Sequence, residues 1–420
     1  MFKKVLDLWR KWYFNISFSF VDQSLLSGAN LFFNILLVRW LLPNEYGIFA
    51  VTYSIFIFFT GFQNALILLP ASVIGVSRYN QNLSKYLSVT TLINWVLVCV
   101  FVVILLLISL IMFFYHHRLA FIFLSLGLAT PFILFFWLFR QICYIKTRPD
   151  LACRANFLYA FFLIGLVFIF KVQGFLSAFN AFMIMAFSGL LATLSFWRYL
   201  DIDKTWNYIG KDLTLFKQIF TQHWRCGRWV VGSALVNWCS TVIYLPLIGI
   251  FAGLDNVAGF RAMQNFNFPL ERILAVLSML FIPWFSKQHR IYGGSYLKKK
   301  FPMFLTASMI MTIIYIAIVL VSGKWMTRFA YGDYYAANYT WLIPFLCAAA
   351  FVMTIIQVIT IYLVVFDRTD AIFWAQAVGT VLTLTEGLFL VYALKLYGAA
   401  IAVLLTSIII SAVLFYFIAR

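Results

Sequence analysis

Hydrophobic positions in this chain form long runs that recur from one end to the other, with short polar segments between them. A helix needs about 20 apolar residues to cross the hydrocarbon of a bilayer, and each run has roughly that length. The runs lie near residues 18–38, 47–70, 87–114, 119–139, 155–170, 176–197, 229–252, 257–285, 301–322, 341–365, 371–393 and 397–418. The pattern predicts an all-α integral membrane protein with about 12 transmembrane helices.

Short motifs of the first half return in the same order in the second half. Leu42–Gly47 (LPNEYG) corresponds to Leu254–Gly259 (LDNVAG), and Pro131 corresponds to Pro344. Equal, even numbers of spans in the two halves give both halves the same orientation. We therefore predict a parallel internal repeat that builds two six-helix lobes.

The polar segments divide the chain further. Ahead of the first span, apolar and basic residues fall on opposite sides of a helix, which is typical of a helix lying in the membrane interface. The basic segment between the two halves has the same amphipathic pattern. We predict an interfacial segment at 1–17, an N-terminal six-helix lobe at 18–199, a cytoplasmic amphipathic linker at 200–228 and a C-terminal six-helix lobe at 229–420.

Composition excludes a soluble domain, because 64% of the residues are hydrophobic and only 10% are charged. The net charge of +18 comes from 31 Lys and Arg against 13 Asp and Glu. Most of these cations fall on the side of the membrane that holds both termini and the linker. We therefore expect both termini in the cytoplasm and contacts with anionic membrane lipids, and no nucleic-acid partner.

Signals of soluble enzyme chemistry are absent from the sequence. The 6 cysteines and 4 histidines have no metal-ligand spacing, and no Gly-rich phosphate loop of the GxxxxGK[ST] kind occurs. We expect a protein that is not an enzyme and holds no metal or cofactor. Coupling to a proton or a sodium ion is left open.

Polar side chains inside spans are costly in hydrocarbon, so their spacing is informative. Two of the spans carry polar residues at intervals of four, three and four, which places each set on one helical face. The set on the first span is Gln23, Ser27, Asn30 and Asn34, and the set on the seventh span, its repeat partner, is Ser233, Asn237, Ser240 and Tyr244.

The eighth span adds positive charge. The same spacing of four, three and four recurs in Arg261, Asn265, Phe268 and Arg272. It puts the two arginines on one face roughly 16 Å apart along the helix. The repeat-equivalent face of the second span, at 49–60, is aromatic and uncharged. Two interpretations remain open for Arg272, either a structural ion pair with a carboxylate such as Glu271 or contact with an anion in a wet cavity. Arg39, at the end of the first span, is a further candidate for substrate contact.

Three carboxylates within or near spans are candidates for ion coupling: Asp22, Glu271 and Glu386. A buried carboxylate could carry a coupling proton across the membrane.

Two segments resemble a known family. Leu37–Phe49 (LVRWLLPNEYGIF) resembles the end of the first span in bacterial polysaccharide flippases, and Ala262–Ser286 resembles their eighth span. These flippases belong to the multidrug/oligosaccharidyl-lipid/polysaccharide exporter superfamily, the MOP superfamily. With the twelve spans and the duplication, the resemblance extends over the whole chain.

The resemblance implies two lobes around a central cavity that opens alternately to each side of the bacterial inner membrane. It implies that the substrate is an undecaprenyl-pyrophosphate-linked oligosaccharide, an O-antigen or similar repeat unit, moved from the cytoplasmic to the periplasmic leaflet. Arg261 and Arg272 suit contact with the pyrophosphate. A polysaccharide polymerase and a chain-length regulator are candidate partners.

Two other functions are compatible with parts of the pattern. A cation-coupled multidrug antiporter on the same fold would present carboxylates such as Asp22 and Glu386 to the cavity. A membrane polymerase or glycosyltransferase would need a large outward loop, and the longest one here, at about 323–340, is too short for a catalytic domain.

Overall fold

The computed structural model describes residues 2–200 and 213–419, and every regular element in these ranges is helical. In the first half the elements are α1 (Phe2–Trp40), α2 (Pro43–Gln63), the π-helical turn η1 (Asn64–Leu68), α3 (Leu69–Arg78), η2 (Asn80–Asn82), α4 (Leu83–Tyr115), α5 (His117–Ile145), α6 (Pro149–Val172), α7 (Ala178–Phe196) and η3 (Trp197–Leu200). In the second half they are α8 (Leu213–Thr241), α9 (Tyr244–Phe251), α10 (Leu254–Gln264), η5 (Asn265–Asn267), α11 (Phe268–Tyr331), α12 (Asp333–Asn338), α13 (Leu342–Val365), α14 (Thr369–Leu382), the π-helical turn η6 (Thr383–Gly387) and α15 (Leu388–Ala419).

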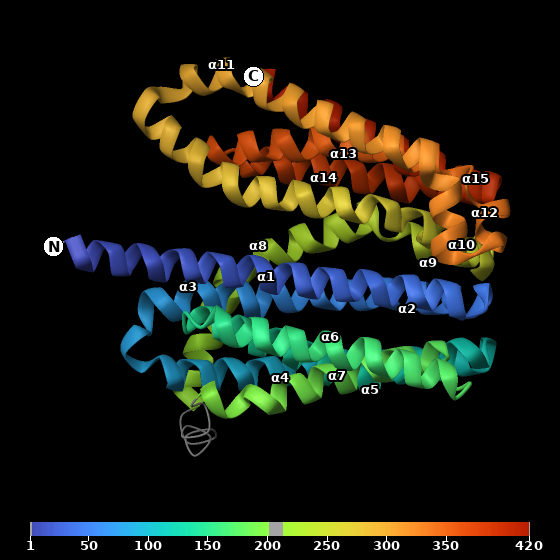
Figure 1. The fold of residues 1–420 in the computed structure, drawn as a ribbon, viewed down its shortest axis with the longest axis horizontal. Helices are drawn as coiled ribbons and strands as arrows, with labels where there is room; N and C mark the ends of the chain where they lie inside the picture. Colours follow the sequence, from blue (N-terminus) through green and yellow to red (C-terminus); the bar gives the residue numbers. More distant parts are fainter. Residues whose placement is uncertain (1, 201–212, 420) are drawn as a thin grey trace. The chain divides into compact units, whose positions relative to one another are not determined.

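Helix α11 contains a complete reversal of the chain. Its 64 residues would extend to about 96 Å if they were straight, about three times the thickness of the hydrocarbon core. Gly293 breaks the helix with φ 80° and ψ 175°, a left-handed conformation that favours glycine. The two arms pack antiparallel, with the rings of Phe281 and Phe304 4.4 Å apart. Figure 1 shows this hairpin, with its turn at the end of the second half that lies opposite α10 and α12.

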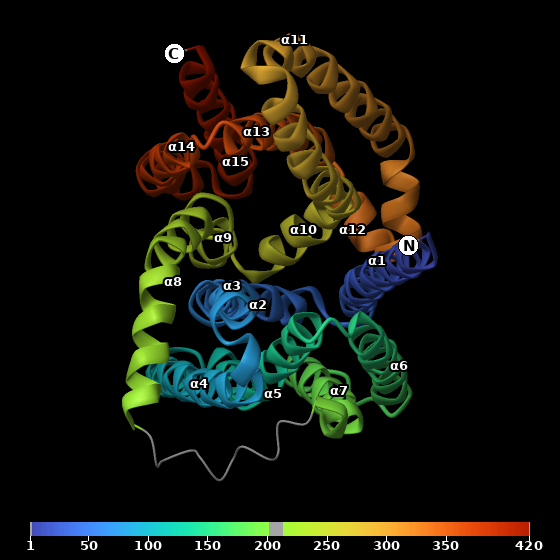
Figure 2. The same cartoon turned by 90° about the vertical axis from the view of Figure 1, so that its left-hand side faces the viewer.

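Helix α15 reverses in the same way at Lys395, which has φ 51° and ψ −123°. A Cβ placed on Gly398 would lie near the carbonyl oxygen of Leu390, at 1.9 Å, whereas a straight helix would separate these residues by about 12 Å. Further along the two arms, Ala375 of α14 packs in one core cluster with Ile410 of α15. Figure 2 shows α13, α14 and α15 gathered side by side in the second half.

These reversals explain the number of spans. In the described ranges, nine helices are long and apolar enough to cross a membrane, and α8 with α9 forms one further span bent by 41°. Two of the nine contain the reversals at Gly293 and Lys395 and therefore count twice. The twelve spans and the all-α membrane fold expected from the sequence are confirmed.

The chain divides into two compact units. The first comprises residues 1–41 and 55–234, and the second comprises 42–54 and 235–420. Helix α2 therefore begins in the second unit and ends in the first. Glycine at position 47 makes this possible, because a Cβ there would lie 2.0 Å from the carbonyl oxygen of Leu254. The lobes drawn from the sequence, at 18–199 and 229–420, stay a prediction.

The most buried candidate span of each unit is the fourth span in its half of the chain. Helix α5 is the most buried of the candidate spans and α13 is the next, and these are the fourth span of each half. The fully buried Leu134 and Phe139 lie on α5, and the fully buried Leu342 and Ile359 lie on α13. This is the packing that a duplicated six-helix unit predicts.

The predicted linker, 200–228, is not a separate helix where the structure describes it. From Leu213 onward it forms one continuous helix, α8, with the start of the seventh span. His223 lies within α8, and its Nδ1 hydrogen-bonds the carbonyl oxygen of Leu66 in the turn η1 at 2.9 Å. Residues 201–212 of the predicted linker lie outside the described residues.

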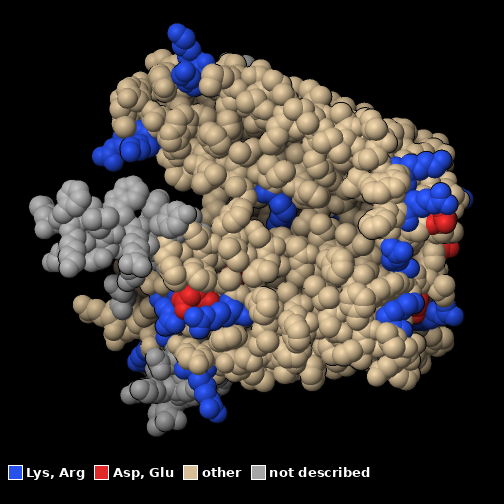
Figure 3. Space-filling view, in the orientation of Figure 1, with Lys and Arg blue, Asp and Glu red and all other residues tan. Residues whose placement is uncertain are grey.

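The predicted interfacial segment, 1–17, is helical from Phe2 and continuous with the first span in α1. The side chains of residues 1–13, on which its amphipathic character rests, lie outside the described residues. On the face drawn in Figure 3, Lys, Arg, Asp and Glu gather mainly near the ends of the helices, and the broad surface between is almost free of charge. This distribution is typical of a protein whose flanks contact lipid.

Candidate functional site

Each unit holds one constellation of charged residues inside its spans, and the two differ in how the charge is satisfied. In the first unit, Asp22 of α1 is fully buried. Its Oδ2 accepts hydrogen bonds from Arg140 Nη2 at 2.5 Å and from the Tyr144 hydroxyl at 2.6 Å. Its Oδ1 accepts one from Asn156 Nδ2 at 2.5 Å. Helices α1, α5 and α6 are thereby joined around one carboxylate.

This arrangement bears on the coupling role considered for Asp22. Both carboxylate oxygens are already engaged, and Arg140, itself 8% exposed, supplies the compensating positive charge. A buried ion pair is tolerated when it is well hydrogen-bonded, and it becomes strongly unfavourable when one partner is removed. A coupling cation would therefore have to displace the Arg140 guanidinium. The geometry favours a structural role for Asp22.

The polar set of the first span does not form a single exposed stripe. Gln23 is exposed, whereas Asn30 is half-buried, donates from Nδ2 to the Leu26 carbonyl at 2.9 Å and accepts from the Tyr159 hydroxyl at 3.2 Å. Asn34 is half-buried and has an interaction partner. Asn30 therefore joins α1 to α6 within the first unit.

In the second unit, the eighth span is built from α10, the short turn η5 and the first arm of α11. A 3₁₀ turn advances each residue by about 120° rather than 100°, so three such residues rotate the following helix by about 60° relative to a continuous α-helix. A straight-helix angle between Arg261 and Arg272 therefore does not apply across this turn, and their shared face stays a prediction. Asn265, 7% exposed, is the first residue of the turn.

The two arginines have polar and aromatic partners. Arg261 is half-buried and donates from Nη1 to Gln264 Oε1 at 2.8 Å. Arg272 is exposed, with its Cζ 4.6 Å from the centroid of the Phe268 ring, a cation–π contact. Within residues 2–200 and 213–419, neither arginine forms an ion pair with Asp or Glu.

The structure does not pair Arg272 with Glu271. Both side chains are exposed, and they are adjacent on the helix, where neighbouring residues point about 100° apart. The structural ion pair considered from the sequence is therefore not formed with Glu271.

Aromatic side chains from the start of α2 complete this region. The Tyr46 hydroxyl lies beside Asn265 and Arg261, and both Arg261 and Arg272 act electrostatically on the Tyr53 hydroxyl. Tyr53 thus lies within the electrostatic influence of both arginines. We call Arg261, Arg272, Tyr53 and Phe268 the arginine face.

From the sequence, the second span was interpreted as the uncharged repeat equivalent of the eighth span. The sequence did not predict that residues 46–53 would lie in the same unit as the arginines. The close approach of Gly47 to Leu254 is the local reason for this packing. The sequence signal that could have indicated this packing is Gly47. It lies between Tyr46 and Tyr53, and it corresponds to Gly259 in the second half of the chain.

The polar residues of the seventh span point in different directions. Asn237 is exposed, whereas Tyr244 is 1% exposed at the bend between α8 and α9. The Tyr244 hydroxyl lies 2.9 Å from Thr406 Oγ1 and 3.3 Å from Thr383 Oγ1. Tyr244 therefore holds the seventh, eleventh and twelfth spans together.

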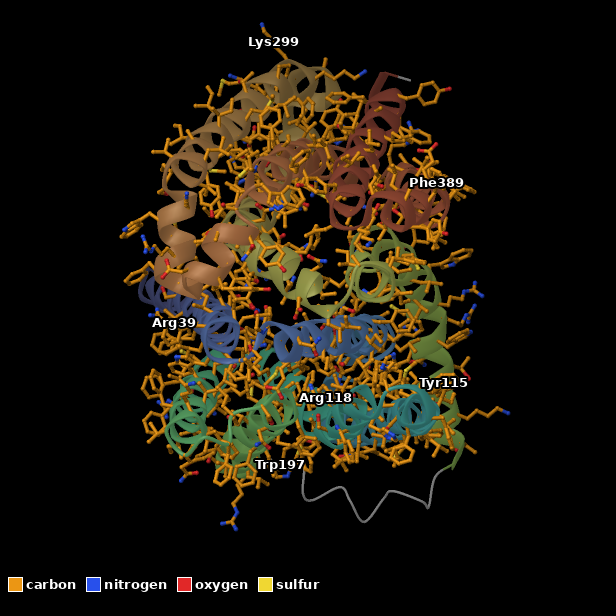
Figure 4. The ribbon with its side chains drawn as sticks, turned by 90° about the vertical axis from the view of Figure 1, so that its right-hand side faces the viewer. Arg39, Tyr115, Arg118, Trp197, Lys299 and Phe389 are labelled. Carbon is orange, nitrogen blue, oxygen red and sulfur yellow. The ribbon has the colours of Figure 1, made fainter. Side chains whose placement is uncertain are left out.

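Glu386 and Arg39 both lie at exposed positions. Glu386 is in the turn η6 and lines an open hollow of about 450 Å³ with Phe389 and Leu405, and Figure 4 shows Phe389 pointing away from the helices of the second unit. Arg39 lies at the end of α1, where Figure 4 labels it, and has an interaction partner. Within the second unit, Glu386 is not among the residues of the arginine face.

The arginine face has the chemistry of an anion site. Guanidinium groups bind phosphate oxygens through paired N–H donors, and they keep their charge at any physiological pH. Aromatic rings beside them can pack against the guanidinium groups and against apolar parts of a ligand. In the described part of the chain no group of three or more His, Cys, Asp or Glu side chains could hold a metal ion.

A family model described as polysaccharide biosynthesis protein matches residues 13–289. No curated protein sequence matches the chain significantly. Among solved structures, the chain is similar to an inward-facing multidrug resistance MATE family transporter of the MOP superfamily, with a TM-score of 0.79 and 12% identity over 95% of this chain and 97% of the other.

Two further structures have the same fold. The lipid II flippase MurJ, in an inward closed conformation, matches with a TM-score of 0.69 and 13% identity over 96% of this chain and 88% of the other. A MOP superfamily transporter from Pyrococcus furiosus, described as having a binding pocket of reverse polarity, matches with a TM-score of 0.64 and 14% identity over 96% and 94%. At these identities the likeness concerns the fold, which is that of MOP superfamily transporters.

Proposed function

The chain belongs to the polysaccharide biosynthesis protein family, and from this premise we propose that it is a flippase for an undecaprenyl-pyrophosphate-linked oligosaccharide. The substrate is an O-antigen or similar repeat unit, carried from the cytoplasmic to the periplasmic leaflet of the bacterial inner membrane. The excess of Lys and Arg on one side of the spans supports a cytoplasmic location of both termini.

The arginine face is the observation that carries the proposal. Arg261 and Arg272 lie in spans and have no carboxylate partner in the described ranges, whereas the intramembrane Arg140 is neutralised by Asp22. Uncompensated arginines in a membrane region are costly and mark a functional site by default. An anionic ligand would supply the missing charge, and a pyrophosphate has two negatively charged groups to offer two guanidinium groups.

Flipping requires a polar route for the headgroup alone. Sugar hydroxyls and phosphate charges lose their water on entering hydrocarbon, at a cost of several kcal/mol for each unpaired group. Amides, phenols and guanidinium groups such as those of Asn265, Tyr53 and Arg261 can replace that water. The polyprenyl tail is apolar and can remain in the lipid throughout.

The antiporter alternative has weaker support in this chain. Its structural basis is the fold shared with a multidrug resistance transporter. A cation-coupled antiporter would need an available carboxylate, and Asp22 is occupied by Arg140, Tyr144 and Asn156. Glu386 is exposed and outside the arginine face, and a coupling role for it stays a prediction.

Deletion of the coding sequence tests the function directly. We expect loss of the surface polysaccharide together with accumulation of complete lipid-linked repeat units that face the cytoplasm, measured by extraction and mass spectrometry of the lipid intermediates. If the protein were a polymerase, its deletion would instead leave single repeat units on the outer side of the membrane. Normal surface polysaccharide combined with new drug sensitivity would contradict the proposal and favour the antiporter.

Reconstitution tests the substrate class. Proteoliposomes that contain the purified protein should move a fluorescent undecaprenyl-pyrophosphate-linked oligosaccharide between leaflets, measured by its accessibility to an added glycosidase. The matched control is the same glycan on a neutral polyprenyl carrier, which lacks the pyrophosphate. Equal rates for the two lipids would remove the pyrophosphate from recognition. A polymerase and a chain-length regulator remain proposed partners that would act on the product.

A further inference from the structure

The short helix α12 packs against one end of the arginine face through a cluster of tyrosines. Tyr46, Tyr331, Tyr335 and Tyr339 are all buried, and the rings of Tyr331 and Tyr335 lie 6.2 Å apart. The Tyr331 side chain lies beside Asn265, as the Tyr46 side chain does. We call these four residues the tyrosine cluster. It connects α12 and its flanking turns to the residues next to Arg261.

The packing of α12 on α10 is close. A Cβ on Gly259 would lie 2.2 Å from Cδ1 of the Tyr339 ring, so only glycine permits this ring to lie flat against α10. Gly259 is two residues before Arg261. The segment 331–341, part of the longest outward connection expected from the sequence, is therefore folded onto the end of the arginine face.

One polar group of this cluster has no partner. The Tyr335 side chain is 3% exposed, and its hydroxyl makes no hydrogen bond to any residue that the structure describes. Nearly all buried polar groups in native proteins are hydrogen-bonded, and an unsatisfied one destabilises the fold relative to an apolar group of the same shape. Phenylalanine would fill the same space without the unsatisfied oxygen. A tyrosine at this position is accounted for by a second conformation of α12, in which the Tyr335 hydroxyl has a hydrogen-bond partner.

The connection of α12 to α11 is suited to such a rearrangement. Gly332, between them, has φ 98°, a conformation that residues with a Cβ rarely adopt. The ion pair that spans it, Arg328 Nε to Asp333 Oδ1 at 2.5 Å, is mostly exposed, with side chains 70% and 77% accessible. Exposed pairs contribute little to stability. The link between α11 and α12 can therefore rearrange without losing a strong ion pair, and the tyrosine cluster is what holds α12 in place.

We propose that α12 is a movable cap over the outward end of the arginine face, and that Tyr335 is the positioning residue whose hydroxyl gains a hydrogen-bond partner when the cap opens. The partner is water or a hydroxyl of the departing oligosaccharide, the groups that meet this end of the unit. The hydroxyl thereby lowers the free energy of the open cap relative to the closed one. This inference rests on the proposed function, because the cap controls release of the substrate that the arginine face binds.

The test is Tyr335→Phe, with Tyr334→Phe as the matched control. Tyr334 is adjacent, lies in the same helix and is 46% exposed, and its hydroxyl lies beside Tyr339 and is not among the unsatisfied groups. We expect Tyr335→Phe to slow flipping in proteoliposomes by about fivefold to tenfold, the change that corresponds to one hydrogen bond in the open state. Tyr334→Phe should flip at the wild-type rate.

Two further measurements distinguish a movable cap from a structural or binding role of Tyr335. Binding of undecaprenyl pyrophosphate to the purified Tyr335→Phe protein should stay within about twofold of wild type, since the arginine face is intact. Its thermal unfolding temperature in detergent should be unchanged or raised, because an unsatisfied oxygen has been removed. A maximal rate that falls while affinity and stability do not is the signature of a positioning residue.

Each contrary outcome overturns the inference. Wild-type flipping by Tyr335→Phe would mean that the hydroxyl plays no part in release. Slower flipping with a lower unfolding temperature, or with weaker pyrophosphate binding, would make Tyr335 a structural or binding residue rather than part of a cap. A failure of the proposed function gives a different result from a failure of the cap. In that case the wild-type protein itself would not move the pyrophosphate-linked glycan.

Discussion

The intramembrane arginines of the two units differ in what neutralises them. In the first unit, Arg140 donates to Asp22, and the pair is closed off by Tyr144 and Asn156. In the second unit, Arg261 and Arg272 contact an amide oxygen and aromatic rings. Among the described residues, Arg140 therefore has a carboxylate partner, whereas Arg261 and Arg272 do not. We therefore propose a structural role for Arg140 and an anion-binding role for Arg261 and Arg272.

The largest expected effect comes from removing the exposed charge of the arginine face. Arg272→Ala should abolish surface polysaccharide, because no neighbouring cation of α11 in the membrane region can replace the guanidinium. Arg272→Lys should retain partial export, since it keeps the charge and loses the planar paired donors. Surface polysaccharide is measured by gel electrophoresis of the extracted glycan.

The matched control for Arg272→Ala is Arg290→Ala, on the same helix at the exposed turn between its two arms. Figure 4 shows Lys299 of this turn projecting away from the unit. The control should export normally. Wild-type export by Arg272→Ala, in a protein that reaches the membrane in normal amount, would remove Arg272 from the mechanism.

The complementary prediction concerns the neutralised pair. Asp22→Asn should destabilise the protein by about 3–5 kcal/mol, because it leaves the Arg140 charge buried without its carboxylate. Asp22→Leu combined with Arg140→Met should recover most of this stability, because no isolated charge then remains. Both are measured by thermal or denaturant unfolding of the purified protein in detergent.

The double variant also decides the role of Asp22 in transport. If the pair is structural, the stable double variant should still flip the substrate. A stable double variant without transport would show that the Asp22 carboxylate acts in coupling. The proposal that the charged pair of the first unit is structural, while the arginines of the second unit bind the ligand, would then be wrong.

Residues near each other in sequence were easier to interpret than residues brought together by the fold. The spans follow from hydrophobic length, and their number is correct even though α11 and α15 each continue through a reversal with a single non-helical residue. The Asp22–Arg140 pair was not predicted, because 118 positions separate the two residues and helical spacing carries no information about contacts between helices. The same limitation hid the contact of Tyr46 with Arg261.

Residue spacing also overstated how regular the polar faces of the seventh and eighth spans are. Intervals of four, three and four place residues on one face only while the helix remains regular. The turn η5 interrupts the α-helix between Arg261 and Arg272, and the bend between α8 and α9 separates the exposed Asn237 from the buried Tyr244. These irregular turns satisfy local backbone and side-chain contacts that depend on the packed helices, so the sequence pattern alone did not locate them.

An intermediate effect is expected for Arg261. Its guanidinium is half-buried and already held by Gln264 and Tyr46, so part of its role is to position the start of α2. Arg261→Ala should lower the flipping rate by about tenfold, the effect of one lost charge-assisted hydrogen bond. The assay is flipping in proteoliposomes. Gln264→Ala is the control, and it should have a smaller effect, because it removes a partner of Arg261 without removing the charge.

The smallest expected effect concerns Tyr244, a residue that the sequence grouped with the polar face and the structure places in the packing of three spans. Tyr244→Phe removes the bond to Thr406 at 2.9 Å and should lower stability by about 1 kcal/mol with no change in flipping. Tyr53→Phe, beside both arginines, should instead slow flipping with no loss of stability. Unfolding in detergent and transport in proteoliposomes measure the two effects. If Tyr244→Phe and Tyr53→Phe slowed transport equally, a position beside the arginines would not explain the effect of Tyr53. The proposed contrast in the second unit, between polar groups that pack helices together and polar groups that face the ligand, would then be wrong.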